Sequence, residues 1–169
     1  MTPTLPIHPL QADTFAPYGQ VLPLGAAPAR SINGGTSTRL DLPSGLDLHR
    51  EGGQPVLAVF RAQAQAAHGP WQTLERHRLG TQSFVPLQAL RWLVLVARGA
   101  DAPDPGTLAA FEATPGQGIT LWADTWHHPL IALDDGDFVV LERQGDAVDC
   151  EVQHLADPVT LRCDGLTLR

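Results

Sequence analysis

Apolar and polar residues alternate over short stretches of this chain, and glycine or proline separates one stretch from the next. The 15 prolines and 16 glycines interrupt the sequence every few residues, which favours many short strands joined by turns over long helices. Residues 91–97 are apolar almost throughout and are predicted to form the most buried strand. The other strands are expected at residues 4–10, 21–24, 38–42, 56–61, 71–77, 82–86, 118–122, 129–133, 137–143 and 150–155, with helical turns near 13–19 and 107–111.

The most polar of these stretches covers residues 75–86, which read Glu-Arg-His-Arg-Leu-Gly-Thr-Gln-Ser-Phe-Val-Pro. We interpret it as a strand, a tight turn at Leu79-Gly80 and a returning strand. Because side chains alternate across a strand, Glu75 and His77 are expected on the same face. Gln82 begins the returning strand and is expected to join them. The pattern therefore predicts a polar cluster inside a β framework.

About a dozen short strands around one buried polar cluster predict an all-β fold, either a closed β-barrel or a jelly roll, with a few short helical turns. The length of 169 residues is most simply accommodated by a single domain, 1–169. No repeat, heptad pattern or low-complexity linker divides the chain.

Composition narrows the possible functions. The net charge is −7, from 18 acidic and 11 basic residues, which argues against nucleic acid and anionic membranes as partners. All eleven basic residues are arginine, so Schiff-base catalysis by a lysine is excluded. Cys150 and Cys163 have no ligand-like spacing and fit unpaired thiols in a reducing compartment. With no signal-peptide pattern at the start and no apolar run long enough to span a bilayer, a cytoplasmic location is expected.

The polar cluster has the spacing of a known barrel family. Glu75-x-His77-x4-Gln82 resembles the first cupin motif, in which His-x-His and a later glutamate hold a metal ion. The second cupin motif, Gly-x5-Pro-x-Gly-x2-His, is matched in spacing from Gly116 to His127, although its proline and inner glycine are replaced. The resemblance covers roughly residues 69–131 and implies a cupin-like jelly-roll barrel. It also makes His127, rather than His128, the inward-facing histidine.

The sequence is compatible with a site that binds a metal ion and with a site that does not. Glu75, His77, Gln82 and His127 offer oxygen and nitrogen ligands to a divalent ion, which would act as a Lewis acid. Glutamine lacks the charge of a carboxylate, so the ion would be held weakly. We favour acid–base catalysis without a tightly bound metal or other required cofactor.

Two longer motifs carry a closer resemblance. The stretch 75–86, followed by Trp-His-His-Pro-Leu at 126–130, resembles the ureidoglycolate lyase family, long called ureidoglycolate hydrolase. Weaker matches extend the resemblance, in order, over most of the chain. They are Phe15-x-x-Tyr18-Gly19, Ile32-Asn33-x-Gly35 with Arg39 after it, and residues 103–111. This chain departs from the family at Arg78, where proline is frequent, and at residues 31–34, where relatives often carry His-x-Asn-Asn.

The resemblance implies that the enzyme splits (S)-ureidoglycolate into glyoxylate and urea during allantoin and purine-nitrogen breakdown. In this carbinolamide a hydroxyl and a urea nitrogen share one carbon beside a carboxylate. Cleavage needs a base for the hydroxyl proton, an acid for the departing nitrogen and a cation for the carboxylate. Glu75, His77 and His127 are expected to divide the acid and base roles.

The substrate contacts follow partly from geometry and partly from the resemblance. We favour Arg39 over Arg76 as the carboxylate ligand, because strand alternation turns Arg76 away from Glu75 and His77. Gln82 is expected to hold the urea group or a water. The resemblance adds Tyr18, Asn33 and His128 as further substrate-binding residues.

Several alternatives are open. His128 can instead cross a subunit interface or bond a backbone carbonyl, Asn33 can be a plain turn residue, and Trp126 is expected to pack in the core. Glu142-Arg143 is interpreted as a solvated ion pair. At the level of function, the alternatives are a metal-dependent cupin enzyme on another small carboxylate and a barrel that binds a small ligand without catalysis. A homodimer is expected, because pairing would cover exposed strand edges.

Overall fold

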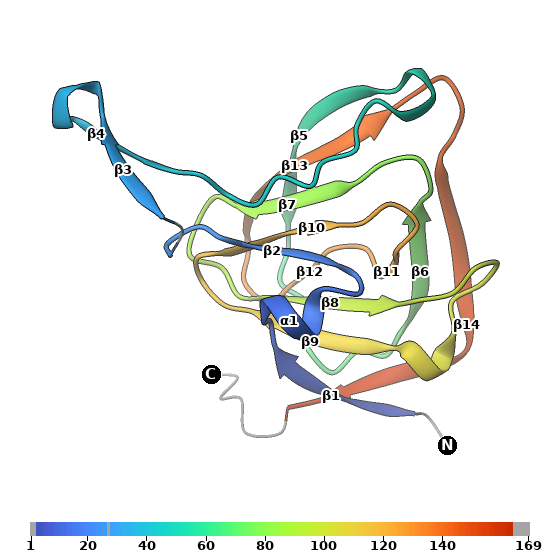
Figure 1. Ribbon diagram of the computed structural model, residues 1–169. Coiled ribbons are helices and arrows are strands. Elements are labelled where there is room, and N and C mark those ends of the chain that lie inside the picture. The colour runs from blue at the N-terminus through green and yellow to red at the C-terminus, as the bar shows by residue number, and fades with distance from the viewer. Residues whose placement is uncertain (1–2, 27, 164–169) are drawn as a thin grey trace.

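The computed structural model describes residues 3–26 and 28–163, and these form an almost entirely β architecture of jelly-roll type (Figure 1). The all-β prediction is therefore confirmed. One sheet has the order β11 (Trp126–His127), β6 (Trp71–His77), β14 (Cys150–Arg162), β1 (Thr4–Pro9), β9 (Ala109–Ala113), β8 (Trp92–Ala97), β12 (Ile131–Ala132). The second has the order β2 (Gly19–Pro23), β10 (Gln117–Leu121), β7 (Gln82–Pro86), β13 (Gly136–Gln144), β5 (Gln54–Ala62). The remaining elements are β3 (Ala29–Ile32) paired with β4 (Ser37–Leu40), the helix α1 (Ala12–Phe15), and the 3₁₀ turns Asn33–Gly35, Arg50–Gly52 and Pro105–Thr107.

Strand β8 lies at the centre of the core and is buried on both faces. Trp92, Val94 and Val96 belong to the apolar cluster between the two sheets, which also takes side chains from β7, β10 and β13. Leu93 and Leu95 belong to a second cluster, with residues of β6 and β14. A strand covered on both sides reads as a continuous apolar run rather than an alternating one. The prediction of residues 91–97 as the most buried strand is confirmed.

The short strand β11 closes the first sheet. It pairs with β6 through His127 and Glu75, and with β8 through Trp126 and His127. The strands β6, β14, β1, β9, β8 and β11 therefore form a ring of hydrogen-bonded neighbours. Closure leaves His127 fixed between two longer strands, in register with Glu75.

The expected strand–turn–strand unit at residues 75–86 is different in the structure. β6 and β7 belong to separate sheets, so Leu79-Gly80 lies in a crossover and not in a hairpin turn. Long-range hydrogen bonds hold the crossover: Asp149 accepts from the backbone N–H groups of Arg78 (2.6 Å) and Leu79 (3.1 Å). A Cβ on Gly80 would lie 2.5 Å from Cβ of Arg143, so a larger residue would not fit there. The crossover places the side chains of β6 and β7 on opposite walls of one interior.

A second local prediction is also wrong. Residues 107–111 were expected to form a helical turn, but a 3₁₀ turn covers Pro105–Thr107 and the strand β9 follows it. Ala110 and Phe111 are buried, and β9 pairs with β1 on one side and β8 on the other. Tertiary pairing thus overrides the local helical pattern. Across the described residues, no helix is long and apolar enough to cross a membrane.

Candidate active site

Glu75, His77 and His127 converge between the sheets. Alternation along β6 buries Leu74 and Arg76 on one face and leaves Glu75 and His77 half-buried on the other. His127 on β11 is 3 % exposed. One side-chain nitrogen or oxygen from each of the three residues lies within 4.8 Å of the others. The sequence-predicted trio is thus brought together by two neighbouring strands.

Hydrogen bonding fixes the ring of His127. Its Nδ1 lies 2.9 Å from the carbonyl oxygen of Thr125, and a carbonyl only accepts, so Nδ1 carries the proton. Nε2 therefore faces Glu75, whose Oε1 is 3.5 Å away. At this separation Nε2 of His127 has no hydrogen-bond partner among the described residues, and a proton placed between the two acceptors would stabilise the pair. This pair can supply a proton to a bound molecule.

Burial and neighbouring charges set the protonation of the other groups. Burial raises the pKa of Glu75, but the contacts with His127 and His77 outweigh it and hold that pKa below its ordinary value. Burial and the nearby His127 lower the pKa of His77, against the opposing effect of Glu75 and Glu142. The rings of His77 and His127 are nearly parallel, with centroids 5.8 Å apart. Nε2 of His77 is buried and has no hydrogen-bond partner among the described residues, so this nitrogen is available as a base when the ring is neutral.

Gln82 reaches the same interior from β7 on the opposite sheet. It is 4 % exposed, and its Nε2 donates to Oε2 of Glu142 at 2.8 Å. This bond fixes the orientation of the amide, so Oε1 is presented as an acceptor. In the part of the chain that the structure describes, this buried atom has no hydrogen-bond partner. A buried acceptor of this kind marks a position where a ligand N–H or O–H would be bound.

Glu142 is the site residue that the sequence analysis missed. It lies opposite Gln82 in the register of β13 and β7. The expected solvated ion pair with Arg143 is wrong, because the Arg143 side chain is 3 % exposed and pairs with Asp149 at 3.5 Å. Strand periodicity held the missing signal: Phe138, Val140 and Glu142 share one face of β13, so Glu142 continues an inward-facing apolar row.

Two hollows lead to the cluster. A cavity of about 410 Å³ is lined by His77, Glu142 and the loop that connects β13 to β14. A second, of about 360 Å³, is lined by Glu75, Phe84 and Leu130. Pockets for small molecules are typically about 300–1,000 Å³. Both hollows therefore suit a small metabolite.

His128 and Tyr18 are not members of the three-residue cluster. Nδ1 of His128 lies 2.7 Å from the carbonyl oxygen of Pro129, and its ring packs edge-on against Trp71. Burial lowers the pKa of His128, against the effect of the Pro129 carbonyl. Tyr18 is a core residue whose hydroxyl donates to the carbonyl of Thr107 at 2.8 Å, and burial raises the pKa of that hydroxyl.

Asn33 and Arg39 lie on a separate part of the molecule. The β3–β4 hairpin stands away from both sheets (Figure 1). Asn33 begins its tip with φ of 51°, a left-handed conformation that suits a turn residue. Arg39 is exposed and pairs with Asp41 at 2.6 Å. Neither residue is among the lining residues of the two hollows in its own chain.

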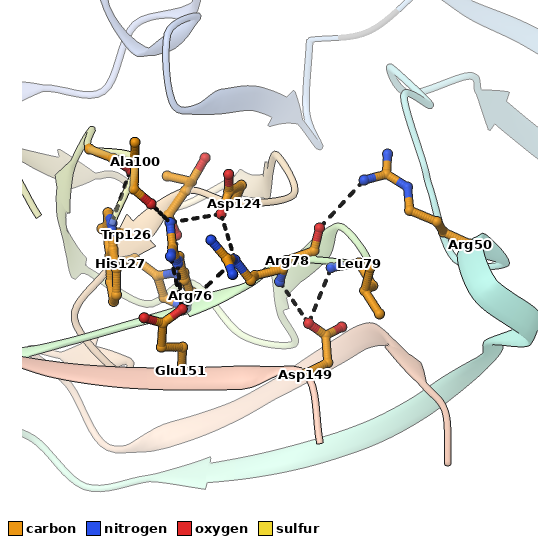
Figure 2. A network of polar contacts seen from close by, with 12 residues as sticks. Arg50, Arg76, Arg78, Leu79, Ala100, Asp124, Trp126, His127, Asp149 and Glu151 are labelled. Atoms are coloured by element: carbon orange, nitrogen blue, oxygen red, sulfur yellow. Dashed lines mark hydrogen bonds and ion pairs between the residues drawn. The ribbon is translucent and has the colours of Figure 1, made fainter. Parts of the chain in front are cut away.

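A buried arginine, Arg76, lies on the face of β6 opposite Glu75 and His77. Figure 2 shows Arg76 between Trp126, Asp124 and Glu151. Its guanidinium lies 4.3 Å from the Trp126 ring centroid and 2.9 and 2.8 Å from Asp124 and Glu151. As expected from alternation, Arg76 points away from Glu75, and Trp126 is fully buried packing. These contacts tie β6, β11 and β14 together directly behind the catalytic candidates.

Comparison with known proteins agrees with this geometry. The family model for ureidoglycolate lyase matches residues 2–162. A ureidoglycolate lyase of Burkholderia cepacia is 37 % identical over 96 % of this chain and 89 % of its own length. The one of Burkholderia mallei is 38 % identical over 96 % of each chain, and ureidoglycolate lyase 1 of Rhizobium meliloti is 36 % identical over 91 % of each. The chain belongs to the ureidoglycolate lyase family.

Proposed function

We propose that this protein cleaves (S)-ureidoglycolate into glyoxylate and urea, by acid–base catalysis between the two sheets. The observation that carries the proposal is the convergence of Glu75, His77 and His127 within 4.8 Å of one another in a member of this family. One carboxylate and two imidazoles are sufficient for the two proton transfers that the reaction needs. No covalent intermediate is required.

The two proton transfers are assigned to different groups. Neutral His77, with its free Nε2, takes the proton of the substrate hydroxyl. The oxygen then forms the aldehyde of glyoxylate while the carbon–nitrogen bond breaks and its electrons pass to nitrogen. The proton shared by His127 and Glu75 is delivered to that nitrogen, which leaves as urea. Two titrating groups held in different protonation states thus act as base and acid.

Gln82 is assigned to the urea group. Its buried Oε1 accepts from a urea N–H, and Glu142 holds the amide in the orientation that makes this possible. Without Glu142, the amide could turn and present its N–H₂ group instead. Glu142 therefore acts as a positioning residue for substrate recognition.

A metal-dependent reaction is the second candidate. Glu75, His77 and His127 have the atom types and the spacing to hold a divalent ion. Bound there, an ion would supply Lewis-acid polarisation of the substrate's hydroxyl or carboxylate oxygen. Gln82 is hydrogen-bonded to Glu142, and the ion could be held by the other three residues without it. We favour the metal-free reaction, because the His127–Glu75 contact already provides the acid.

We further propose that the protein works as a cytoplasmic homodimer on a small-molecule substrate. β5 is the terminal strand of its sheet, so one edge of its backbone has no strand partner there. Leu57 is 70 % and Val59 58 % exposed on its outer face, an arrangement that favours pairing with another chain. Cys150 and Cys163 are not joined in a disulfide, in agreement with a reducing compartment.

Product analysis tests the proposed function. Glyoxylate, urea and ammonia are followed together on ureidoglycolate, before and after exhaustive chelation. Equal amounts of glyoxylate and urea, unaffected by chelation, are expected. Loss of activity that one divalent ion restores would establish the metal-dependent candidate. Ammonia in place of urea would make the enzyme a hydrolase, and no turnover would reject the function.

A further inference from the structure

We call the β3–β4 hairpin, residues 29–40, the arm; within the described residues its two strands pair with each other and join neither of the larger sheets. Ten of its twelve residues are exposed, and only Ile32 and Leu40 are half-buried. Its side chains bond locally, as in the contact of Asn33 with Ser37 at 3.5 Å. A two-stranded ribbon on its own is only marginally stable in water. A surface that covers the arm would therefore stabilise it.

One face of the arm is cationic. Arg30 and Arg39 are directly opposite each other in the β3–β4 register, so their side chains emerge on the same face. The two side chains are 61 % and 55 % exposed, and both contact Asp41. An exposed ion pair of this kind contributes little to stability. Arg39 can therefore exchange Asp41 for an anionic partner that binds it more strongly.

The cavity beside His77 has the opposite charge and needs a cation. The wall beside His77 carries Glu142, Asp146 and Asp149, whereas the proposed substrate is a carboxylate. The arginine in that wall, Arg143, is held by Asp149 and by the carbonyl of Arg50. The carboxylate of the substrate would be repelled by this acidic wall unless another arginine entered the cavity and paired with it.

The second hollow offers one other arginine. Arg61 lines it, but both of its side-chain hydrogen bonds go to Asp137, at 3.0 and 3.2 Å. The preceding Phe60 packs inward against Phe84, so alternation turns Arg61 outward. Arg61 is therefore the matched comparison for Arg39, because each is an exposed arginine paired with an aspartate.

We propose that the arm of one subunit closes over the cavity beside His77 of a second subunit, where Arg39 binds the carboxylate of the substrate. This proposal rests on the proposed function and commits to a second copy of this chain as the partner. The cationic face of the arm, formed by Arg30 and Arg39, complements the acidic wall of the cavity. Closure also excludes water from His77 and His127. Each active site then contains its acid and base from one chain and its carboxylate ligand from the other.

The single variants give the first test. Arg39→Ala removes a charged hydrogen-bond donor and is expected to raise KM roughly 10- to 150-fold, with kcat little changed. Arg61→Ala is expected to leave both constants within about twofold. An unchanged KM in Arg39→Ala, or a rise in Arg61→Ala instead, would overturn the proposal.

Subunit mixing gives the decisive test. Arg39→Ala and His127→Asn are co-expressed with different tags, and the mixed dimers are assayed below KM. If the arm acts in trans, each mixed dimer has one site with both defects and one with neither. Random pairing of equal amounts then restores roughly a quarter of wild-type activity. Activity no higher than the two parents, in a sample that native mass spectrometry shows to contain mixed dimers, would overturn the proposal, as would a monomeric wild-type protein.

Hydrogen–deuterium exchange separates this proposal from the proposed function. The arm amides are expected to be protected in the dimer and to exchange rapidly in a monomeric variant such as Leu57→Arg. If the arm amides of the wild-type protein are protected but ureidoglycolate is not turned over, the proposed function is rejected and the proposed docking of the arm is supported. Rapid exchange of residues 29–40 in the dimer overturns the docking even if turnover is normal.

Discussion

The interior cluster and the arm carry the two halves of the proposed reaction, and they are built in opposite ways. Glu75, His77 and His127 lie on paired strands of a closed ring, and the His127 ring is further fixed by a backbone carbonyl. Arg39 lies on an exposed hairpin whose bonds are local. Proton transfer needs atoms held within fractions of an ångström, whereas an exposed element that docks from a second chain is sufficient to bind a carboxylate. The proposed proton transfer and the proposed carboxylate recognition are thus placed on different parts of the fold.

The largest effect is expected in the cluster. His127→Asn removes the acid and should lower kcat on the order of 10²- to 10⁴-fold, with KM little changed, in a steady-state assay of glyoxylate release. His128→Asn is the matched comparison, since His128 is the next residue and lies outside the cluster; its loss should stay below about tenfold. Equal losses in both variants would contradict the assignment of His127.

The free energy of unfolding distinguishes an arginine beside the interior cluster, Arg76, from an arginine on the arm, Arg39. Arg76→Ala should lower the free energy of unfolding by about 3 kcal/mol, because it removes a fully buried side chain that packs on Trp126 and bonds to Asp124 and Glu151. Arg39→Ala should change it by no more than about 0.5 kcal/mol, because that ion pair is exposed. Urea unfolding measures both. A stability loss in Arg39→Ala as large as that in Arg76→Ala would show that the arm is part of the rigid core.

The smallest effect is expected at the positioning residue. Glu142→Gln should raise KM by about tenfold, because it releases the amide of Gln82 from its fixed orientation. The same change in a Gln82→Ala background should have almost no further effect, since the group that Glu142 positions is then absent. Steady-state kinetics of the four proteins measure this coupling. Additive losses would mean that Glu142 acts independently of Gln82.

The parts of the fold that periodicity controls could be predicted from the sequence. Alternation along residues 71–77 separates Glu75 and His77 from Arg76, and the apolar run of β8 reflects its two buried faces. Both features depend on the local chain alone. Motif spacing likewise identified His127, rather than His128, as the residue that joins the cluster.

The features that depend on distant partners could not be predicted. Leu79-Gly80 reads as a tight turn, but β6 and β7 belong to different sheets, so it lies in a crossover that Asp149 holds by accepting two backbone hydrogen bonds. Glu142 reads as a surface charge until its strand is placed beside Gln82. Arg39 was expected at the carboxylate, and nothing in the local sequence indicates that a hairpin carries it away from its own barrel. That assignment stays a prediction, now directed at the neighbouring subunit.

The central claim is that neutral His77 is the base of the reaction, and the pH dependence of kcat/KM tests it most directly. Burial lowers the pKa of His77, so the neutral form persists below the ordinary histidine value of about 6.5. The kcat/KM of the wild-type enzyme should therefore stay constant as the pH is lowered to about 6.5, and should fall at lower pH, where His77 becomes protonated. His77→Gln should lose about 10²- to 10⁴-fold in kcat and lose this acid limb as well. A His77→Gln enzyme that keeps its activity within a few-fold, with the same limb, would contradict the account.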